Sequence, residues 1–153
     1  MNVGLLRKTA LAGGLLLLYL ISCDDNSAGP DKEELTGTWN AVKIEFTDRN
    51  NSEVVVDVVE EGVTAEMTFE EDGTYRLKVV RPEEPGLDVV GTWSTEGYEQ
   101  TVQWTVEPFS NTWQFDMELD GDRLFLDGAH SNHDFDGDGI NDPAILDFEL
   151  LKV

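Results

Sequence analysis

Between residues 35 and 153 the sequence alternates between apolar and polar positions with a period of two, which is the pattern of half-buried β-strands. Residues 63–69 show it clearly, with Val63 and every second side chain after it apolar. The alternation resumes over residues 74–79, after Asp72 and Gly73. Glycine tolerates the positive φ of a tight turn, so we predict a β-hairpin at this point.

Similar patterns continue along the rest of this region, and turn-forming residues recur about every ten positions. The additional predicted strands span residues 37–47, 52–59, 87–94, 101–106, 113–119, 124–126 and 144–152. No helical period is visible in this part of the chain. Eight or nine short antiparallel strands with one apolar face predict an all-β domain, either a single up-and-down barrel or, as the alternative, a β-sandwich. A barrel also removes exposed strand edges, which favours closure.

The first 22 residues have a different character. Arg7 and Lys8 form a cationic segment, and residues 11–21 are mainly apolar. This apolar run is shorter than the roughly 20 residues that a membrane-spanning helix needs. We therefore predict a signal peptide over residues 1–22. A signal peptide that is cut elsewhere and a short uncleaved anchor are the alternatives.

The four residues Leu20-Ile21-Ser22-Cys23 end the apolar run and include the only cysteine. They resemble the lipobox of bacterial lipoproteins, which implies that Cys23 carries a diacylglycerol and becomes the mature N-terminus. Two or three acyl chains bind a membrane durably, whereas one binds only marginally. The resemblance implies a lipid-anchored protein of the bacterial cell envelope. The outer membrane or the cell surface is favoured, and the periplasmic face of the inner membrane is the alternative.

Charge limits the partners of the mature chain. With 32 acidic and 10 basic residues the formal net charge is −22. This excess excludes nucleic-acid binding and electrostatic docking on anionic lipids. Residues 23–34 are polar, acidic and interrupted by Gly29 and Pro30, so we predict a flexible tether that links the lipidated cysteine to the domain. With the sole cysteine acylated, no disulfide can form and the domain depends on its core.

Two motifs resemble lipocalin-like barrels. The tripeptide Gly37-Thr38-Trp39 opens the first predicted strand, as the Gly-x-Trp signature does in lipocalins, and residues 69–75 resemble a hairpin of bacterial lipocalin-like lipoproteins. The resemblance implies that residues 35–153 form a lipocalin-like barrel with Gly37 and Trp39 at its floor. It also implies a basic side chain over this tryptophan, for which Arg123 and Lys152 are candidates. Gly91-Thr92-Trp93 repeats the tripeptide.

The interior of the predicted barrel decides between two functions. Eight strands enclose a space that side chains can just fill, and a filled barrel binds nothing inside. The four tryptophans are therefore either core aromatics or the walls of a cavity for a small apolar ligand: Trp39, Trp93, Trp104 and Trp113. A packed interior would favour an envelope protein as partner.

An aspartate-rich segment lies inside the predicted long connection of residues 128–143. Its spacing matches the first part of an EF-hand-type calcium loop and resembles thrombospondin type 3 repeats, with acids at positions one, three, five and nine and glycine at six. The predicted Ca²⁺ ligands are Asp134, Asp136, Asp138, Asp142 and the carbonyl of Ile140, whose side chain is expected to pack inward. A solvated acidic loop is the alternative.

The ligand set of this segment is incomplete. Position twelve is Ile145, where an EF-hand has a bidentate glutamate. The further ligand candidates are Asp127, Asn132 and Asp147. His130 and His133 precede the segment with a spacing that can also bind a transition metal, although such a site needs a third ligand.

The sequence contains no recognisable catalytic motif, so we predict that the protein is not an enzyme. The leading hypothesis is a membrane-anchored envelope lipoprotein with a lipocalin-like binding or interaction domain. The alternative is a Ca²⁺-stabilised structural or adhesive surface domain with a filled core.

Overall fold

The computed structural model describes residues 30–95, 101–106 and 111–153, and these residues are almost entirely β-structure. One short helix, α1 (Lys32–Leu35), precedes nine strands. The strands are β1 (Gly37–Asp48), β2 (Val55–Asp57), β3 (Thr64–Phe69), β4 (Thr74–Val80), β5 (Leu87–Ser94), β6 (Thr101–Val106), β7 (Asn111–Asp120), β8 (Arg123–His133) and β9 (Asp142–Lys152).

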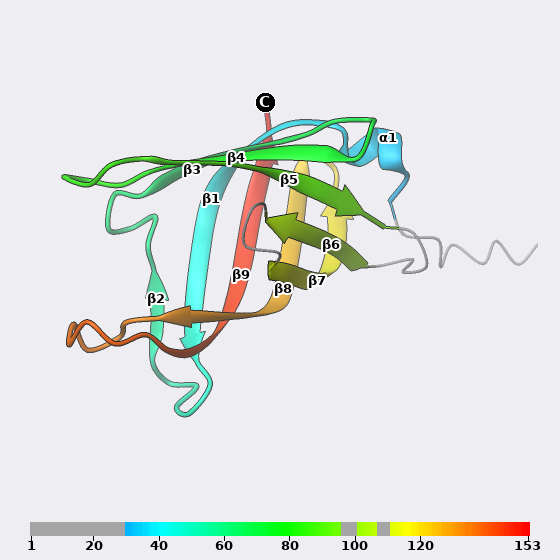
Figure 1. The fold of residues 1–153 in the computed structure, drawn as a ribbon. Helices are drawn as coiled ribbons and strands as arrows, with labels where there is room; N and C mark the ends of the chain where they lie inside the picture. The colour runs from blue at the N-terminus through cyan, green and yellow to red at the C-terminus, as the bar shows by residue number, and fades with distance from the viewer. Residues whose placement is uncertain (1–29, 96–100, 107–110) are drawn as a thin grey trace, which may run out of the picture.

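The strands form a closed antiparallel barrel (Figure 1). From β3 to β9 each strand pairs with the next, and β9 returns to pair with β1 over nearly its whole length. The first residues of β1 pair with β3, which completes a ring of eight strands. Further along, β2 takes the place of β3 beside β1. The predicted single up-and-down barrel is confirmed, and the sandwich alternative is wrong.

The second strand is shorter than the predicted residues 52–59. The carboxylate of Asp57 accepts hydrogen bonds from the backbone N–H groups of Ile44, at 3.3 Å, and Val59, at 3.0 Å. These contacts replace ladder hydrogen bonds at the end of β2, and the chain then turns through Gly62, whose φ is +92°. Local side-chain hydrogen bonds of this kind compete with the strand, and the alternation of residues does not reveal them.

The eighth strand is longer than the predicted residues 124–126. A bulge shifts the β8–β9 register between Leu126 and Ala129, and Gly128 lies there with a φ of +87°. Its backbone N–H donates to the Asp147 carboxylate at 2.6 Å. The bulge breaks the period of two, and β8 bends and continues to His133 (Figure 1). The connection predicted at residues 128–143 is therefore reduced to residues 134–141.

Helix α1 corrects the predicted tether of residues 23–34. Asp31 caps the helix, and the Glu34 carboxylate accepts the Asp31 backbone N–H at 2.9 Å. Leu35, at the helix end, is only 2% exposed. The ordered domain thus begins before residue 35. Cys23 and the predicted signal peptide lie outside the described residues, in which no helix has the length and apolarity to span a membrane.

The side chains of alternate strand residues meet inside the barrel. The predicted inward face of β3 is buried, from Ala65 to Phe69, and so are Tyr75 and Leu77 of β4. Further core residues come from the strands on the other side: Phe115, Met117, Leu124, Leu126, Leu146, Phe148 and Leu150. None of the described buried residues is charged.

Candidate binding cavity and aspartate loop

The end of the barrel that carries α1 is closed, and Trp39 fills its floor. Trp39 is fully buried, and its indole N–H donates to the Leu35 carbonyl at 2.8 Å. Lys152 covers the ring, with Nζ 5.1 Å from the ring centroid. The same ammonium donates to the Glu34 carbonyl at 2.7 Å. Of the two predicted covering residues, Lys152 occupies this place, whereas Arg123 pairs with Glu149.

The repeated tripeptide forms a similar arrangement at the same end. The indole of Trp93 donates to the Glu70 carbonyl at 3.1 Å, and its ring meets Phe69 edge-to-face with centroids 5.1 Å apart. Lys32 of α1 lies over this ring at 5.3 Å. Gly37 and Gly91 begin the two tripeptides, but their roles differ. Gly37 has a φ of +130°, whereas a Cβ on Gly91 would lie 2.0 Å from the Thr105 carbonyl oxygen.

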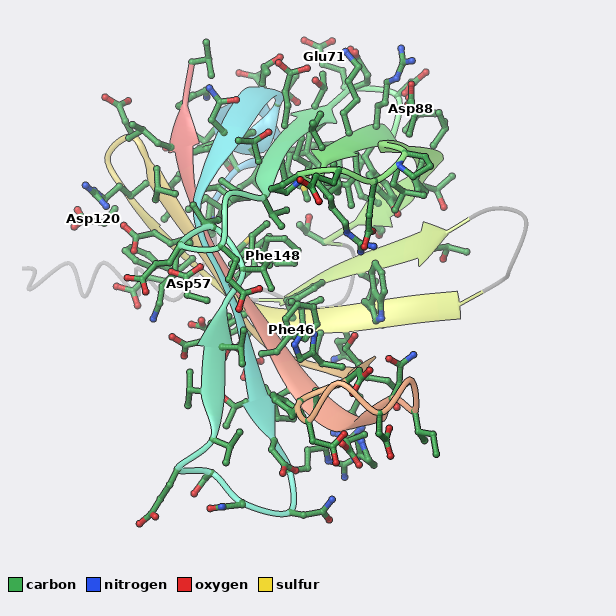
Figure 2. All side chains as sticks on the ribbon, turned by 90° about the vertical axis from the view of Figure 1, so that its left-hand side faces the viewer. Phe46, Asp57, Glu71, Asp88, Asp120 and Phe148 are labelled. Atoms are coloured by element: carbon green, nitrogen blue, oxygen red, sulfur yellow. The ribbon has the colours of Figure 1, made fainter. Side chains whose placement is uncertain are left out.

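The opposite end of the barrel, here called the mouth, contains a cavity of about 770 Å³. Its walls are mainly apolar and come from six strands and the loops at this end. The apolar lining residues are Ile44, Phe46, Val58, Val63, Leu77, Val79, Pro82, Leu87, Trp113, Leu146 and Phe148. In the view toward the mouth, Phe46 and Phe148 lie near the centre of the barrel, and Asp88 and Asp120 lie at its periphery (Figure 2).

Each of the two interpretations of the tryptophans therefore holds at one end of the barrel. Trp39 and Trp93 are core aromatics at the closed end, whereas Trp113 is half-buried and lines the cavity. The side chain of Trp104 lies outside the described part of the chain. A volume of about 770 Å³ falls in the range typical of small-molecule sites.

An aromatic stack joins the cavity wall to the aspartate loop, which we define as residues 134–141. The rings of Phe46 and His133 stack with centroids 4.6 Å apart. Phe135 then meets His133 edge-to-face at 4.9 Å. His133, Asp134 and Asn141 line the cavity, so this loop forms part of the rim of the mouth. Ring stacking of this kind fixes the position of the loop relative to the barrel.

Three of the predicted calcium ligands come together in this loop. The carboxylates of Asp134, Asp136 and Asp138 each offer an oxygen within 4.8 Å of the others. Asp134 accepts the backbone N–H groups of Gly137, at 2.8 Å, and Gly139, at 2.9 Å. Hydrogen bonds from these glycines, that from Gly139 foremost, lower the pKa of Asp134. A cluster of ionised hard oxygens fits Ca²⁺ better than a soft metal.

Asp142 and Ile140 are placed differently from each other. The pKa of Asp142 is raised, first by desolvation and then by the neighbouring charges of Asp136 and Asp48. Asp142 is therefore close to the cluster. The side chain of Ile140 is 67% exposed, so its predicted inward packing is wrong. Gly139, which precedes Ile140, has a φ of +85° and turns the chain just before the start of β9.

Asp48 is the acid at this site that the sequence does not reveal. It ends β1 and pairs with Ala144 of β9, which brings it beside a loop that lies about ninety positions later. Of the further ligands considered, Asn132 pairs with Pro143 next to the loop. Only strand register sets these neighbours, and no local spacing could indicate them.

Asp127 and Asp147 belong to a second acidic group on the outside of the barrel. The pKa of Asp127 is raised by partial desolvation and then by the charges of Asp147, Glu118 and Asp116. The loop aspartates do not contribute to this shift. The two residues are therefore poor candidates for completing the coordination shell of the aspartate loop.

The predicted histidine pair is separated by strand geometry. Residues three apart on a strand face opposite sides. Accordingly, His133 lines the barrel cavity, while His130 lines a shallow surface depression with Asp116 and Asp127. Within the described part of the chain, neither histidine belongs to the group of potential metal ligands.

Comparisons with known proteins leave the family open. No family model matches the sequence, and no curated protein matches it significantly. One similar solved structure is of EF1p2_mFAP2b bound to DFHBI, with 16% sequence identity and a TM-score of 0.48. The alignment covers 83% of this chain and 98% of the other. This similarity is too low to transfer a ligand or an activity.

Proposed function

We propose that this protein is a lipid-anchored lipocalin-like binding protein of the bacterial cell envelope, which holds a small apolar ligand in the mouth cavity. The observation that carries the proposal is the cavity itself. About 770 Å³ of mainly apolar space opens at one end of a barrel whose other end is packed shut around Trp39. Burial of apolar ligand surface in such a space is favourable by about 25 cal/mol per Å².

The end of the barrel at which the described chain begins determines which way the cavity would face relative to the membrane. Pro30, the first described residue, directly precedes α1 at the closed end (Figure 1). Cys23 lies seven positions earlier, a span of at most about 25 Å when fully extended. With its anchor on Cys23, the barrel presents its closed end to the membrane and its mouth to the surroundings. The ligand is then exchanged with the surrounding space or with a partner in it.

Calcium has a supporting role in this proposal. Residues Asp134, Asp136 and Asp138 would hold the ion, and Asp142, Asp48 and the Ile140 carbonyl are the candidates for additional ligands. A bound cation would offset the repulsion among these acids and would fix the loop at the rim. It would stabilise the domain rather than take part in a reaction.

A cavity-blocking variant tests the proposed function. Val79 is half-buried and lines the cavity, whereas Val90 of β5 is 55% exposed. We expect Val79→Trp to reduce binding of the neutral apolar fluorescent probe N-phenyl-1-naphthylamine by at least about tenfold, which corresponds to 1.4 kcal/mol. Val90→Trp is the matched control on the outer face and should bind as the unchanged protein does.

Two results would contradict the proposal. One is the absence of binding of N-phenyl-1-naphthylamine to the unchanged, correctly folded protein. The other is equal binding by the two tryptophan variants, which would place the probe outside the barrel. Circular dichroism of both variants establishes that each retains its β-structure.

A further inference from the structure

The rim of the mouth cavity is predominantly acidic. Four charged residues line it, namely Glu61, Arg81, Glu84 and Asp134. The guanidinium of Arg81 and the carboxylate of Glu84 lie 3.3 Å apart, and both side chains are more than half exposed. Arg81, the one arginine or lysine among the described lining residues, is therefore already next to an acid.

The two remaining acids of the lining, Glu61 and Asp134, are not neutralised by a lysine or an arginine in the described part of the chain. Within the described ranges, no ion pair involves Glu61 or Asp134. Asp134 also stands beside Asp136 and Asp138, whose carboxylates add to the negative potential on this side of the rim. Clustered charges of one sign at the entrance of a low-dielectric cavity concentrate ligands of the opposite charge.

Behind the rim, the described cavity walls offer no charged group. They consist of aliphatic and aromatic side chains, with Ser131, Asn132, His133 and Asn141 grouped near the aspartate loop. An amphiphile would therefore place its apolar part between Phe46 and Phe148 and leave its head group at the rim. An anionic head group would there meet two unpaired acids and would compete with Glu84 for Arg81.

We propose that the cavity selects amphiphiles with a cationic head group over those with an anionic one. The inference rests on the proposed function, because it requires that the cavity binds an apolar chain. The charge arrangement at the rim supplies the additional selectivity. Apolar burial favours all amphiphiles of equal chain length alike, and the head group alone distinguishes them.

Three probes with the same ten-carbon chain test the selectivity: decyltrimethylammonium, decanoate and decanol. Their binding is measured by isothermal titration calorimetry at pH 8, below their micelle-forming concentrations, in about 20 mM salt with EDTA. We expect decyltrimethylammonium to bind at least about tenfold more tightly than decanoate, a difference that two exposed ionic contacts can produce. The difference should narrow in about 0.5 M salt because screening weakens exposed charges.

Variants of equal charge separate the rim from the overall charge of the protein. Glu61→Gln with Glu84→Gln changes the rim, whereas Glu33→Gln with Glu71→Gln changes the closed end. We expect only the rim pair to reduce the preference for the cation. Arg81→Gln should increase the preference, because it removes the base that faces Glu84.

Each outcome has a distinct meaning. Binding of no probe contradicts both the proposed function and this inference. Equal binding of all three probes, or tighter binding of decanoate, overturns the inference and leaves the binding function in place. An equal loss of preference in the rim pair and the closed-end pair also overturns it, since net charge would then explain the preference. A preference lost only in the rim pair supports it.

Discussion

Lys152 lies over Trp39, with Nζ 5.1 Å from the ring centroid, and joins the last strand to the start of the first. Its ammonium also donates to the Glu34 carbonyl of α1 at 2.7 Å. One side chain thus holds together both ends of the described chain and the floor of the barrel. Cation–π contacts and charged hydrogen bonds each contribute about 1 kcal/mol or more when partly shielded from water.

Replacing Lys152 should destabilise the closed end. We expect Lys152→Met to lower the free energy of unfolding by about 1–3 kcal/mol, because it removes both contacts while keeping the aliphatic stem. Urea denaturation measures the change. Arg123→Met is the control, since its exposed ion pair with Glu149 should contribute less than about 1 kcal/mol. An equal effect of the two substitutions would contradict the assigned role of Lys152.

Gly91 permits close approach of β5 to its neighbours. A Cβ at this position would lie 2.0 Å from the Thr105 carbonyl oxygen and 2.7 Å from the Tyr75 ring. We therefore expect Gly91→Ala to destabilise the domain by at least about 1–3 kcal/mol, as overpacking does. Val90→Ala, on the exposed face of the same strand, should change stability by less than about 0.5 kcal/mol. A thermal melt of each variant checks this, and a stable Gly91→Ala protein would refute it.

Asp127 should make the protein less stable at neutral pH. Its raised pKa means that the folded state binds this proton more readily than the unfolded state. Asp127 therefore destabilises the folded state fully at pH values above its folded pKa. This destabilisation decreases as the pH falls through the folded pKa toward the unfolded pKa of about 4. We expect Asp127→Asn to stabilise the domain at pH 7 by less than about 1 kcal/mol after solvent screening.

The gain from Asp127→Asn should shrink toward pH 4 and disappear at about pH 3, below the unfolded pKa, where the carboxyl is protonated in both states. Melting temperatures between pH 3 and pH 8 measure it. Asp120→Asn, at the last residue of β7, removes the same charge elsewhere and separates the local effect from the overall acidity. A decrease in stability at pH 7 on replacing Asp127, or an identical increase for both variants, would disprove the prediction.

Calcium should raise the melting temperature of the domain. With a Kd of about 10⁻⁴–10⁻³ M, a tenfold excess of free Ca²⁺ over Kd stabilises the folded state by about 1.4 kcal/mol. Asp136→Asn should weaken this effect, while the control Asp127→Asn, outside the loop cluster, should leave it unchanged. Calorimetric titration of the EDTA-treated domain gives the affinity directly. No heat and no melting shift at about 5 mM Ca²⁺ would exclude the site.

Replacement of Cys23 tests the proposed anchor. We expect Cys23→Ala to move the protein from the membrane fraction to the soluble fraction, because it removes the proposed acyl chains and a strongly acidic domain is repelled by anionic lipid. Cell fractionation followed by immunoblotting measures the distribution. Metabolic labelling with a radioactive fatty acid is the companion measurement, and label should be absent from the variant. A variant that stays membrane-bound would rule out lipidation at Cys23 as the anchor.

The sequence determined the strands whose alternation is uninterrupted. Leu87–Ser94 and Thr101–Val106 were predicted with their observed bounds, and the Asp72–Gly73 hairpin was found between β3 and β4. The all-β architecture of eight or nine antiparallel strands also followed, because period-two segments of this length with one apolar face can bury that face only against one another. The β1–β9 pairing then decided for the barrel over the sandwich. The position of Trp39 at the floor was implied by the resemblance of Gly37-Thr38-Trp39 to the lipocalin signature.

The tertiary structure decided what depends on register, on bulges and on the volume between strands. Gly128 interrupts the period of β8, so alternation alone could not show that this strand continues to the mouth. Strand pairing brought Asp48 to the aspartate loop, and no spacing in the sequence records that distance. The volume left open at the mouth likewise depends on the positions of many side chains together. The same alternation of apolar residues packs the closed end around Trp39 and lines an open cavity at the mouth, so alternation alone does not record the interior volume.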